Sequence, residues 1–108
     1  MVLPITPSIQ EITHSLLTQK NLRVYVVRED MLHPDISGNK WRKLYYNIEA
    51  AKQQKAATLI TFGGAYSNHI TATAAVGKEF GFKTIGFIRG EEHFPLNPTL
   101  RFAKQNGM

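Results

Sequence analysis

The sequence predicts an α/β protein built from parallel strand–helix–strand units. Three segments rich in β-branched residues alternate with segments whose apolar residues recur at helical spacing. Parallel strands need crossover connections, so this alternation predicts right-handed units with helices packed on the sheet. Three strands make a small sheet, and a central parallel strand needs helices on both faces, so an incomplete architecture with exposed apolar surface is expected.

The first half of the chain predicts two helices separated by one strand. The Pro-Ser pair at 7–8 predicts the start of a short helix that reaches about Leu17. A β-rich run predicts a strand over 23–28, followed by a loop. Asn39 is the expected cap of a helix over 39–55. Its apolar residues share one face of that helix and predict its buried side: Trp41, Leu44, Tyr45, Ile48 and Ala51.

The middle of the chain predicts a buried strand followed by a helix. A continuous apolar strand over 58–62 is closed by the glycines at 63–64. Ser67 is the expected N-cap of a helix over 68–80. Gly81 follows where a left-handed residue ends a helix.

The last part predicts a further strand and helix. The strand covers 83–89 and ends at Gly90. Asn97 caps the final helix and Pro98 takes its first position, where the missing proline N–H costs nothing. That helix is expected to reach about Asn106.

Composition excludes several classes of protein. The 108 residues are 43% hydrophobic and 19% charged, which is typical of one small soluble domain rather than a disordered chain. The chain has no cysteine, so disulfides, thiolate zinc sites and cysteine catalysis are excluded. The histidines show no metal-ligand spacing, so no metal is expected.

The charge pattern favours ordinary solubility over nucleic-acid binding. The net charge of +5 comes from 13 basic against 8 acidic residues, and the basic residues are scattered except near Lys40. The apolar runs are too short to cross a membrane, and the N-terminus has no signal-peptide pattern. A cytoplasmic protein that binds neither nucleic acid nor membrane is expected.

Lys40 stands at the predicted start of a helix and is a candidate nucleophile. A lysine amine must lose its proton before it attacks an aldehyde, and the positive helix end with Arg42 and Lys43 nearby disfavours the ammonium form. The same helix end and Lys43 favour a phosphate group close by. Pyridoxal 5′-phosphate carries both an aldehyde and a phosphate. The alternative is an exposed basic turn without a role.

A glycine-flanked turn, from Gly63 to His69 (GGAYSNH), follows the strand over 58–62. Ligands of open α/β sheets bind at such carboxyl ends, and amides at a helix start hold carboxylate or phosphate. Ser67 adds a hydroxyl and Asn68 an amide group. The turn matches neither the dinucleotide nor the Walker pattern. Ser67 as a plain cap, and His69 as a hydrogen-bonded helix-start residue, remain open alternatives.

Together these motifs resemble those of fold-type II pyridoxal-phosphate enzymes, the tryptophan-synthase-β-like class. They look most like the 1-aminocyclopropane-1-carboxylate deaminase and D-cysteine desulfhydrase family. Three runs carry the resemblance, which extends over nearly the whole chain: Arg28-Glu29-Asp30, Gly38 to Leu44 (GNKWRKL) and Gly63 to Asn68 (GGAYSN). The resemblance implies an open three-layer parallel-sheet fold. Residues 1–50 would begin the large cofactor-binding domain, and residues 51–108 would form part of the small α/β domain.

The resemblance also implies roles for individual residues. Lys40 would form the Schiff base with pyridoxal phosphate and later move the α-proton. Lys43 would contact the cofactor phosphate, and Asn68 the hydroxyl of the pyridine ring. Ser67 and His69, with Asn68 and the amides of the turn, would face the substrate carboxylate. Elimination or ring opening, then hydrolysis, would convert a small amino acid into a 2-oxo acid and ammonia.

Two departures from the family pattern change what is expected. His69 stands where the deaminase proper has glutamine, which leaves desulfhydrase-like chemistry open. The family's glycine-rich phosphate loop, pyridine-nitrogen partner and late tyrosine lie beyond the point that matches Met108. The chain is therefore expected to be an N-terminal fragment without efficient turnover alone, from a full-length protein that forms a homodimer.

Two other functions stay open at this point. One is a non-catalytic α/β module that binds phosphate or carboxylate at the Ser67 turn. The other is a protein-interaction domain that pairs with homologous chains. Replacing Lys40 by arginine separates the enzyme from the binding module, because it removes Schiff-base formation and leaves anion binding in place.

Overall fold

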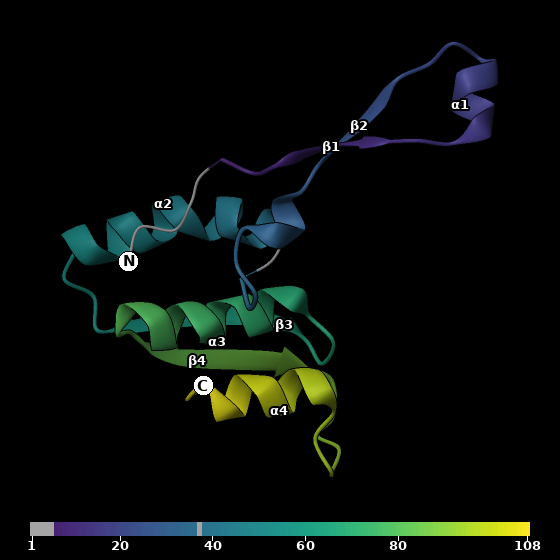
Figure 1. Ribbon diagram of the computed structural model, residues 1–108. Helices are drawn as coiled ribbons and strands as arrows, with labels where there is room; N and C mark the ends of the chain where they lie inside the picture. The colour runs from purple at the N-terminus through teal and green to yellow at the C-terminus, as the bar shows by residue number, and fades with distance from the viewer. Residues whose placement is uncertain (1–5, 37) are drawn as a thin grey trace.

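The structure is a computed structural model, and it describes residues 6–36 and 38–108. Its elements follow the chain as shown in Figure 1: β1 (Ile9–Ile12), α1 (Ser15–Gln19), β2 (Val24–Val27), the 3-10 turn η1 (Glu29–Met31), α2 (Asn39–Gln53), β3 (Thr58–Gly64), α3 (Asn68–Phe80), β4 (Lys83–Arg89) and α4 (Pro98–Gln105). The described chain thus alternates strands and helices from β3 onward, as the sequence predicts.

The central unit is β3–α3–β4, with the two strands parallel. Their register runs from Thr58 opposite Lys83 to Gly64 opposite Arg89. The glycines at 63–64 belong to β3 rather than following it, so the strand is two residues longer than predicted. The predicted parallel crossover is therefore confirmed for these two strands.

The strand predicted over 23–28 does not join this sheet. β2 instead pairs antiparallel with β1, so the described chain holds two separate two-stranded sheets. The helix predicted from the Pro-Ser pair at 7–8 is wrong: residues 9–12 form β1, and α1 is a single turn that His14 caps. The two isoleucines of β1 favour a strand, and pairing with β2 satisfies the backbone groups that a helix would otherwise have bonded locally.

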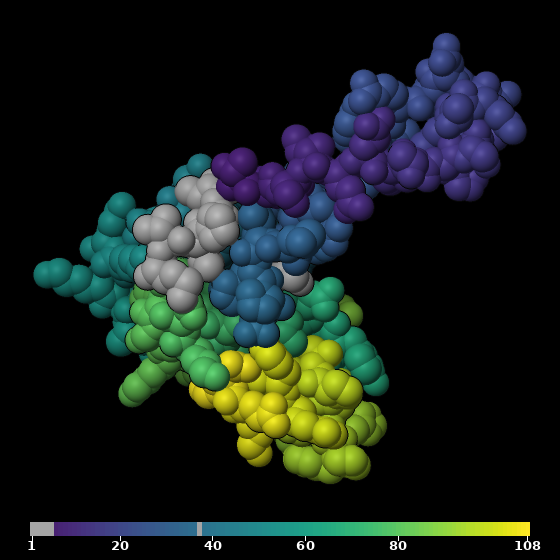
Figure 2. Space-filling model, viewed as in Figure 1, coloured from purple at the N-terminus to yellow at the C-terminus, as the bar shows by residue number. Residues whose placement is uncertain are grey.

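The β1–α1–β2 segment forms an arm that projects from the rest of the molecule (Figure 2). The Cα radius of gyration is 17.4 Å, whereas a compact domain of this length has about 13 Å. The arm exposes a set of large apolar side chains: Ile9, Ile12, Leu16, Leu22, Val24, Tyr25 and Val27. It therefore lies outside the hydrophobic core.

The predicted buried face of α2 is confirmed, with Tyr45 at its half-buried edge. Its buried residues are Trp41, Leu44, Ile48 and Ala51. Most of this face packs in one core cluster with Ala72, Ala75 and Val76 of α3, which are small enough to let the two helices approach closely. The helix ends at Gln53 rather than Lys55, whose φ of 53° is left-handed.

The predicted bounds of α3 are confirmed at both ends. The Ser67 hydroxyl accepts hydrogen bonds from the N–H groups of His69 and Ile70, and Gly81 ends the helix at a φ of 79°. Gly77 lies in the middle of α3 and touches β4: a Cβ there would stand 2.3 Å from Thr84 Cγ2 and 2.9 Å from the Phe82 carbonyl oxygen. The close approach of α3 to the sheet therefore needs a glycine at this position.

The last helix, α4, packs against α3 on the same face of the sheet. Its Ala103 joins Ile70 and Ala74 of α3 in a second buried cluster. A Cβ added at Gly86 of β4 would meet both Ile70 and Met108, which places both helices on one side. The cap at Asn97 and the proline at position 98 start α4 as predicted.

The opposite face of the parallel sheet is uncovered. Alternate residues on paired positions point to it, and Phe62 and Phe87 stack there with ring centroids 5.2 Å apart. Phe62 is 72% exposed and Phe87 is 55% exposed. Ile60 and Ile85 extend the same apolar stripe. The exposed apolar surface that the sequence predicts is therefore present.

We predict that Gly77→Ala lowers the free energy of unfolding by roughly 1–2 kcal/mol, because overpacking against the Phe82 backbone outweighs the better helix propensity of alanine. Gly86→Ala is the matched control: its nearest neighbour is the flexible end of Met108, 2.7 Å away, which can move. Urea unfolding followed by circular dichroism measures both. Equal stability of the Gly77 variant and the wild type would contradict the close contact.

Candidate functional site

Lys40 is the second residue of α2 and is half-buried. Its Nζ donates a hydrogen bond to Asn39 Oδ1 at 2.6 Å. Asn39 was expected as the helix cap, and this is wrong: Gly38 takes that position with φ 60° and ψ −144°, a backbone conformation that other residues adopt only with strain. The asparagine side chain is thus turned to the lysine amine instead of to the helix backbone.

Glu29 forms hydrogen bonds with one residue before Lys40 and one residue after it, Gly38 and Arg42. Its carbonyl oxygen accepts the Gly38 N–H at 3.2 Å. Its carboxylate accepts from Arg42 Nε at 3.1 Å and from Nη2 at 3.2 Å. A bidentate guanidinium–carboxylate pair has a defined geometry. The first turn of α2, and the lysine within it, are therefore fixed to η1.

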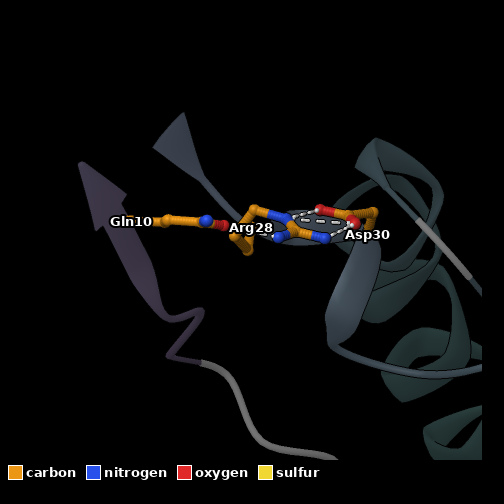
Figure 3. Close-up of polar contacts among 3 residues, drawn as sticks. All are labelled: Gln10, Arg28 and Asp30. Atoms are coloured by element: carbon orange, nitrogen blue, oxygen red, sulfur yellow. Dashed lines mark hydrogen bonds and ion pairs between the residues drawn. The ribbon is translucent and has the colours of Figure 1, made fainter. Parts of the chain in front are cut away.

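The η1 turn is in turn fixed to the arm through Arg28 (Figure 3). Arg28 Nη2 lies 2.7 Å from Asp30 Oδ2, and Nη1 donates to Gln10 Oε1 at 2.7 Å. The hydrogen bond from Arg28 lowers the pKa of Asp30 below its ordinary value. Sequence analysis assigned no physical role to Arg28, Glu29 and Asp30. A basic residue followed by two acidic residues directly after a strand was the signal that could have suggested these ion pairs.

The Ser67 turn sits at the carboxyl end of β3. Gly64 and Ser67 close a tight turn, with the Ser67 N–H bonded to the Gly64 carbonyl at 3.1 Å. A Cβ at Gly63 would lie 2.7 Å from Ile70 Cγ1 and 3.0 Å from Ser67 Oγ, so a larger residue would disturb the cap. Ser67 Oγ accepts from two backbone N–H groups, which leaves its own hydroxyl hydrogen as a donor.

His69 connects this turn with the lysine helix. It is half-buried, and its pKa is lowered first by that burial and then by the positive charges of Lys40 and Lys43. Lys40 and Lys43 precede His69 by 29 and 26 positions in the sequence, and the fold brings them within electrostatic reach of it. The imidazole is held toward its neutral form, in which one ring nitrogen donates and the other accepts.

The remaining candidate residues lie on the same two helix starts. Lys43 is exposed on α2, one turn after Lys40. Asn68 is exposed as the first residue of α3, and its carbonyl accepts from the Thr71 hydroxyl at 3.0 Å. The structure thus brings an amine, a second cation, a hydroxyl and the amides of a helix start together. This donor set suits an aldehyde and an anionic group.

Two further features, a metal site and a membrane-spanning helix, are not found among the described residues. Within residues 6–36 and 38–108, no group of three or more histidine or acidic side chains is placed to hold a metal ion. In the same part of the chain, no helix is both long and apolar enough to cross a membrane.

Sequence and structure comparisons identify known proteins that are similar to this chain. No protein-family model matches the chain. A candidate 1-aminocyclopropane-1-carboxylate deaminase of Thermotoga maritima is 37% identical over 90 residues, 83% of this chain. A D-cysteine desulfhydrase of Salmonella paratyphi B is 33% identical over 84 residues, 78% of this chain. The crystal structure of an ACC deaminase homologue superposes on the whole chain with a TM-score of 0.82 and 30% identity.

The chain matches the N-terminal part of the 1-aminocyclopropane-1-carboxylate deaminase and D-cysteine desulfhydrase family. It spans 29% of the Thermotoga protein, 24% of the Salmonella protein and 32% of the crystallised chain. The expected fold class, an N-terminal portion of a fold-type II α/β architecture, is confirmed by this structural match.

We predict that His69 titrates below the ordinary histidine value of about 6.5. In Lys43→Gln its pKa rises, because one of the two charges that lower it is gone. NMR titration of the imidazole protons measures the shift. Lys104→Gln, on the far helix α4, is the control and leaves the His69 pKa unchanged.

The direction of this pKa shift determines how the stability of the fold changes with pH. Since the folded-state pKa lies below that of the unfolded chain, the unfolded chain binds more protons between the two values. The contribution of His69 to stability is complete above about pH 6.5 and is lost as the pH falls through the folded-state pKa. An imidazole that titrates at or above 6.5 in the wild type would contradict its burial beside the two lysines.

Proposed function

We propose that the chain is part of a pyridoxal-phosphate enzyme that converts a small amino acid into a 2-oxo acid and ammonia. The activity is that of a 1-aminocyclopropane-1-carboxylate deaminase or of a D-cysteine desulfhydrase. The observation that carries the proposal is the packing of α2, which bears Lys40, against α3, which follows the anion-binding turn. The lowering of the His69 pKa by the charges of Lys40 and Lys43 supports the same pairing. The names of the related proteins support the same reaction class.

The residues present fit this cofactor. The amine of Lys40, held by Asn39, is the group that an aldehyde needs. Lys43 and the start of α2 would hold the phosphate, and the exposed Asn68 would bond the ring hydroxyl. When bound, pyridoxal phosphate withdraws electrons from the α-carbon of an amino acid. Ser67, Asn68 and His69 would then hold the substrate carboxylate.

The proton transfers fall to this chain's own side chains. Lys40 Nζ takes the proton from the substrate α-carbon, and Asn39 Oδ1 lies where it can orient that nitrogen. Neutral His69 donates one hydrogen bond to a carboxylate without adding a charge that would compete with the lysines.

Further features of the whole protein belong to this proposal. Residues 1–50 would contribute to the large domain and residues 51–108 to the small domain. The full-length protein would act as a homodimer in the cytoplasm, without nucleic-acid or membrane partners. Since the chain spans at most a third of the related proteins, we expect residues 1–108 alone to lack efficient turnover.

A non-catalytic anion-binding module is the second candidate. The Ser67 turn and the helix start that follows it lie within the described chain, so their amides are presented by residues that the structure describes. On this alternative Lys40 has no covalent role. The two candidates differ in what borohydride does to the protein in the presence of pyridoxal phosphate.

We predict that borohydride reduction of the native gene product with pyridoxal phosphate labels Lys40, as found by peptide mapping with mass spectrometry. Lys40→Arg abolishes the label, because a guanidinium does not form the Schiff base. Lys52→Arg is the matched control on the exposed side of the same helix and keeps full labelling. Unselective or absent labelling of a folded protein would contradict the enzyme and favour the binding module.

A further inference from the structure

The Asn97 side chain makes two hydrogen bonds through two different atoms, and only one of them serves its helix. Its Oδ1 accepts the Leu100 N–H at 2.9 Å, which is the ordinary N-cap of α4. Its Nδ2 donates to the Ala65 carbonyl at 2.8 Å, in the turn that precedes α3. Both bonds are part-buried, and the second joins residues 32 positions apart.

The cap alone does not explain an asparagine here. Aspartate, serine and threonine also cap helices, and each offers an oxygen to the backbone. Aspartate has no donor, and a serine or threonine hydroxyl would have to cap and donate through one atom, whereas asparagine caps with Oδ1 and donates from a second atom, Nδ2. The bond to Ala65 therefore depends on the amide group of Asn97.

The Ala65 carbonyl belongs to the central peptide of the Gly64–Ser67 turn. The orientation of this central peptide is what distinguishes the common turn types, and a flip reverses the side on which its N–H points. In a trans peptide the N–H points opposite to the carbonyl. Because Asn97 holds the carbonyl toward α4, the Tyr66 N–H points away from α4.

The backbone of Tyr66 favours the same orientation. Its φ is not positive, whereas the flipped turn would need a positive φ at this position, which is costly for tyrosine. Tyr66 and Asn97 therefore both oppose the flip, the first through local sterics and the second through a contact from a distant helix. The amide direction of the turn is set before any ligand arrives.

We propose that Asn97 is a positioning residue for the anion-binding turn and so sets the affinity for the substrate carboxylate. The inference rests on the proposed function, in which the amides of this turn and Ser67 hold that carboxylate. Preorganised donors bind an anion more tightly than donors that must first be ordered. Loss of the bond to Ala65 therefore weakens substrate binding and leaves the reacting groups on α2 in place.

The test uses the native gene product loaded with pyridoxal phosphate. Asn97→Asp keeps the capping oxygen and replaces the donor by an oxygen that faces the Ala65 carbonyl. Asn97→Ser keeps a capping oxygen, carries no charge and is too short to reach Ala65. It therefore tests the loss of the bond without an added negative charge, and it replaces the aspartate variant if that variant fails to fold. Asn106→Asp is the matched control, because Asn106 Nδ2 also donates to a carbonyl, that of Phe102 at 2.9 Å, at the other end of α4.

We expect KM for the amino-acid substrate to rise roughly five- to twentyfold in both Asn97 variants, because one part-buried hydrogen bond is lost. We expect kcat and the absorption spectrum of the bound cofactor to stay near wild-type values. Amide hydrogen exchange of the peptide covering residues 63–69 accelerates in these variants. The Asn106 control changes neither KM nor this exchange.

The outcomes distinguish the contact of Asn97 with Ala65 from the effect of that contact on substrate binding. Faster exchange with an unchanged KM overturns the positioning role, although the contact with Ala65 exists. Unchanged exchange overturns the contact itself. A wild-type protein with no selective cofactor label overturns the proposed function, and the positioning role for substrate falls with it, while the exchange data still report on the turn.

Discussion

The packing of α2 on α3 is the contact on which the candidate site depends. Trp41, Leu44 and Ile48 bury one face of α2 against alanines and valine of α3, and Trp41 also stacks on Phe80 at 6.4 Å. Small side chains on α3 let the helices lie close together, and the charges of Lys40 and Lys43 on α2 act on His69 at the start of α3. Without this burial, Lys40 and His69 would have no fixed relation.

The packing places lysine side chains at the start of α2, where the helix dipole already contributes a partial positive charge. The first two turns of α2 hold Lys40 and Lys43, and its first turn has no acidic residue, which works against the helix dipole. Part of the cost is offset by Glu29, which pairs with Arg42, and by Asn39, which accepts from Lys40. The burial of His69 beside these charges keeps it neutral rather than adding a third cation. A bound anion would stabilise such a site.

Local signals in the sequence predicted the second half of the fold well. Ser67, Gly81 and Asn97 mark helix ends through bonds and backbone conformations within a few residues, so the bounds of α3 and the start of α4 follow from the sequence. The pairing of β1 with β2 was missed because strand pairing depends on a partner elsewhere in the chain, and the Pro-Ser pair suggested a helix start. The start of α2 was misplaced by one residue because Gly38 takes the cap position.

The contacts that shape the site were less accessible to sequence analysis. The hydrogen bonds that Arg42 donates to Glu29 and Asn97 donates to Ala65 span 13 and 32 positions, and neither has a local signature in the sequence. The nearness of Lys40 to His69 followed only from the family resemblance, and the structure supplies its physical cause in the α2–α3 core.

The most direct test of one shared site is a crystal structure of the native gene product soaked with pyridoxal phosphate. The account predicts electron density joined to Lys40 Nζ, with the phosphate beside Lys43 at the start of α2 and the ring hydroxyl at Asn68. Cofactor density at another lysine, or a Lys40 amine turned away from the Ser67 turn, would contradict it.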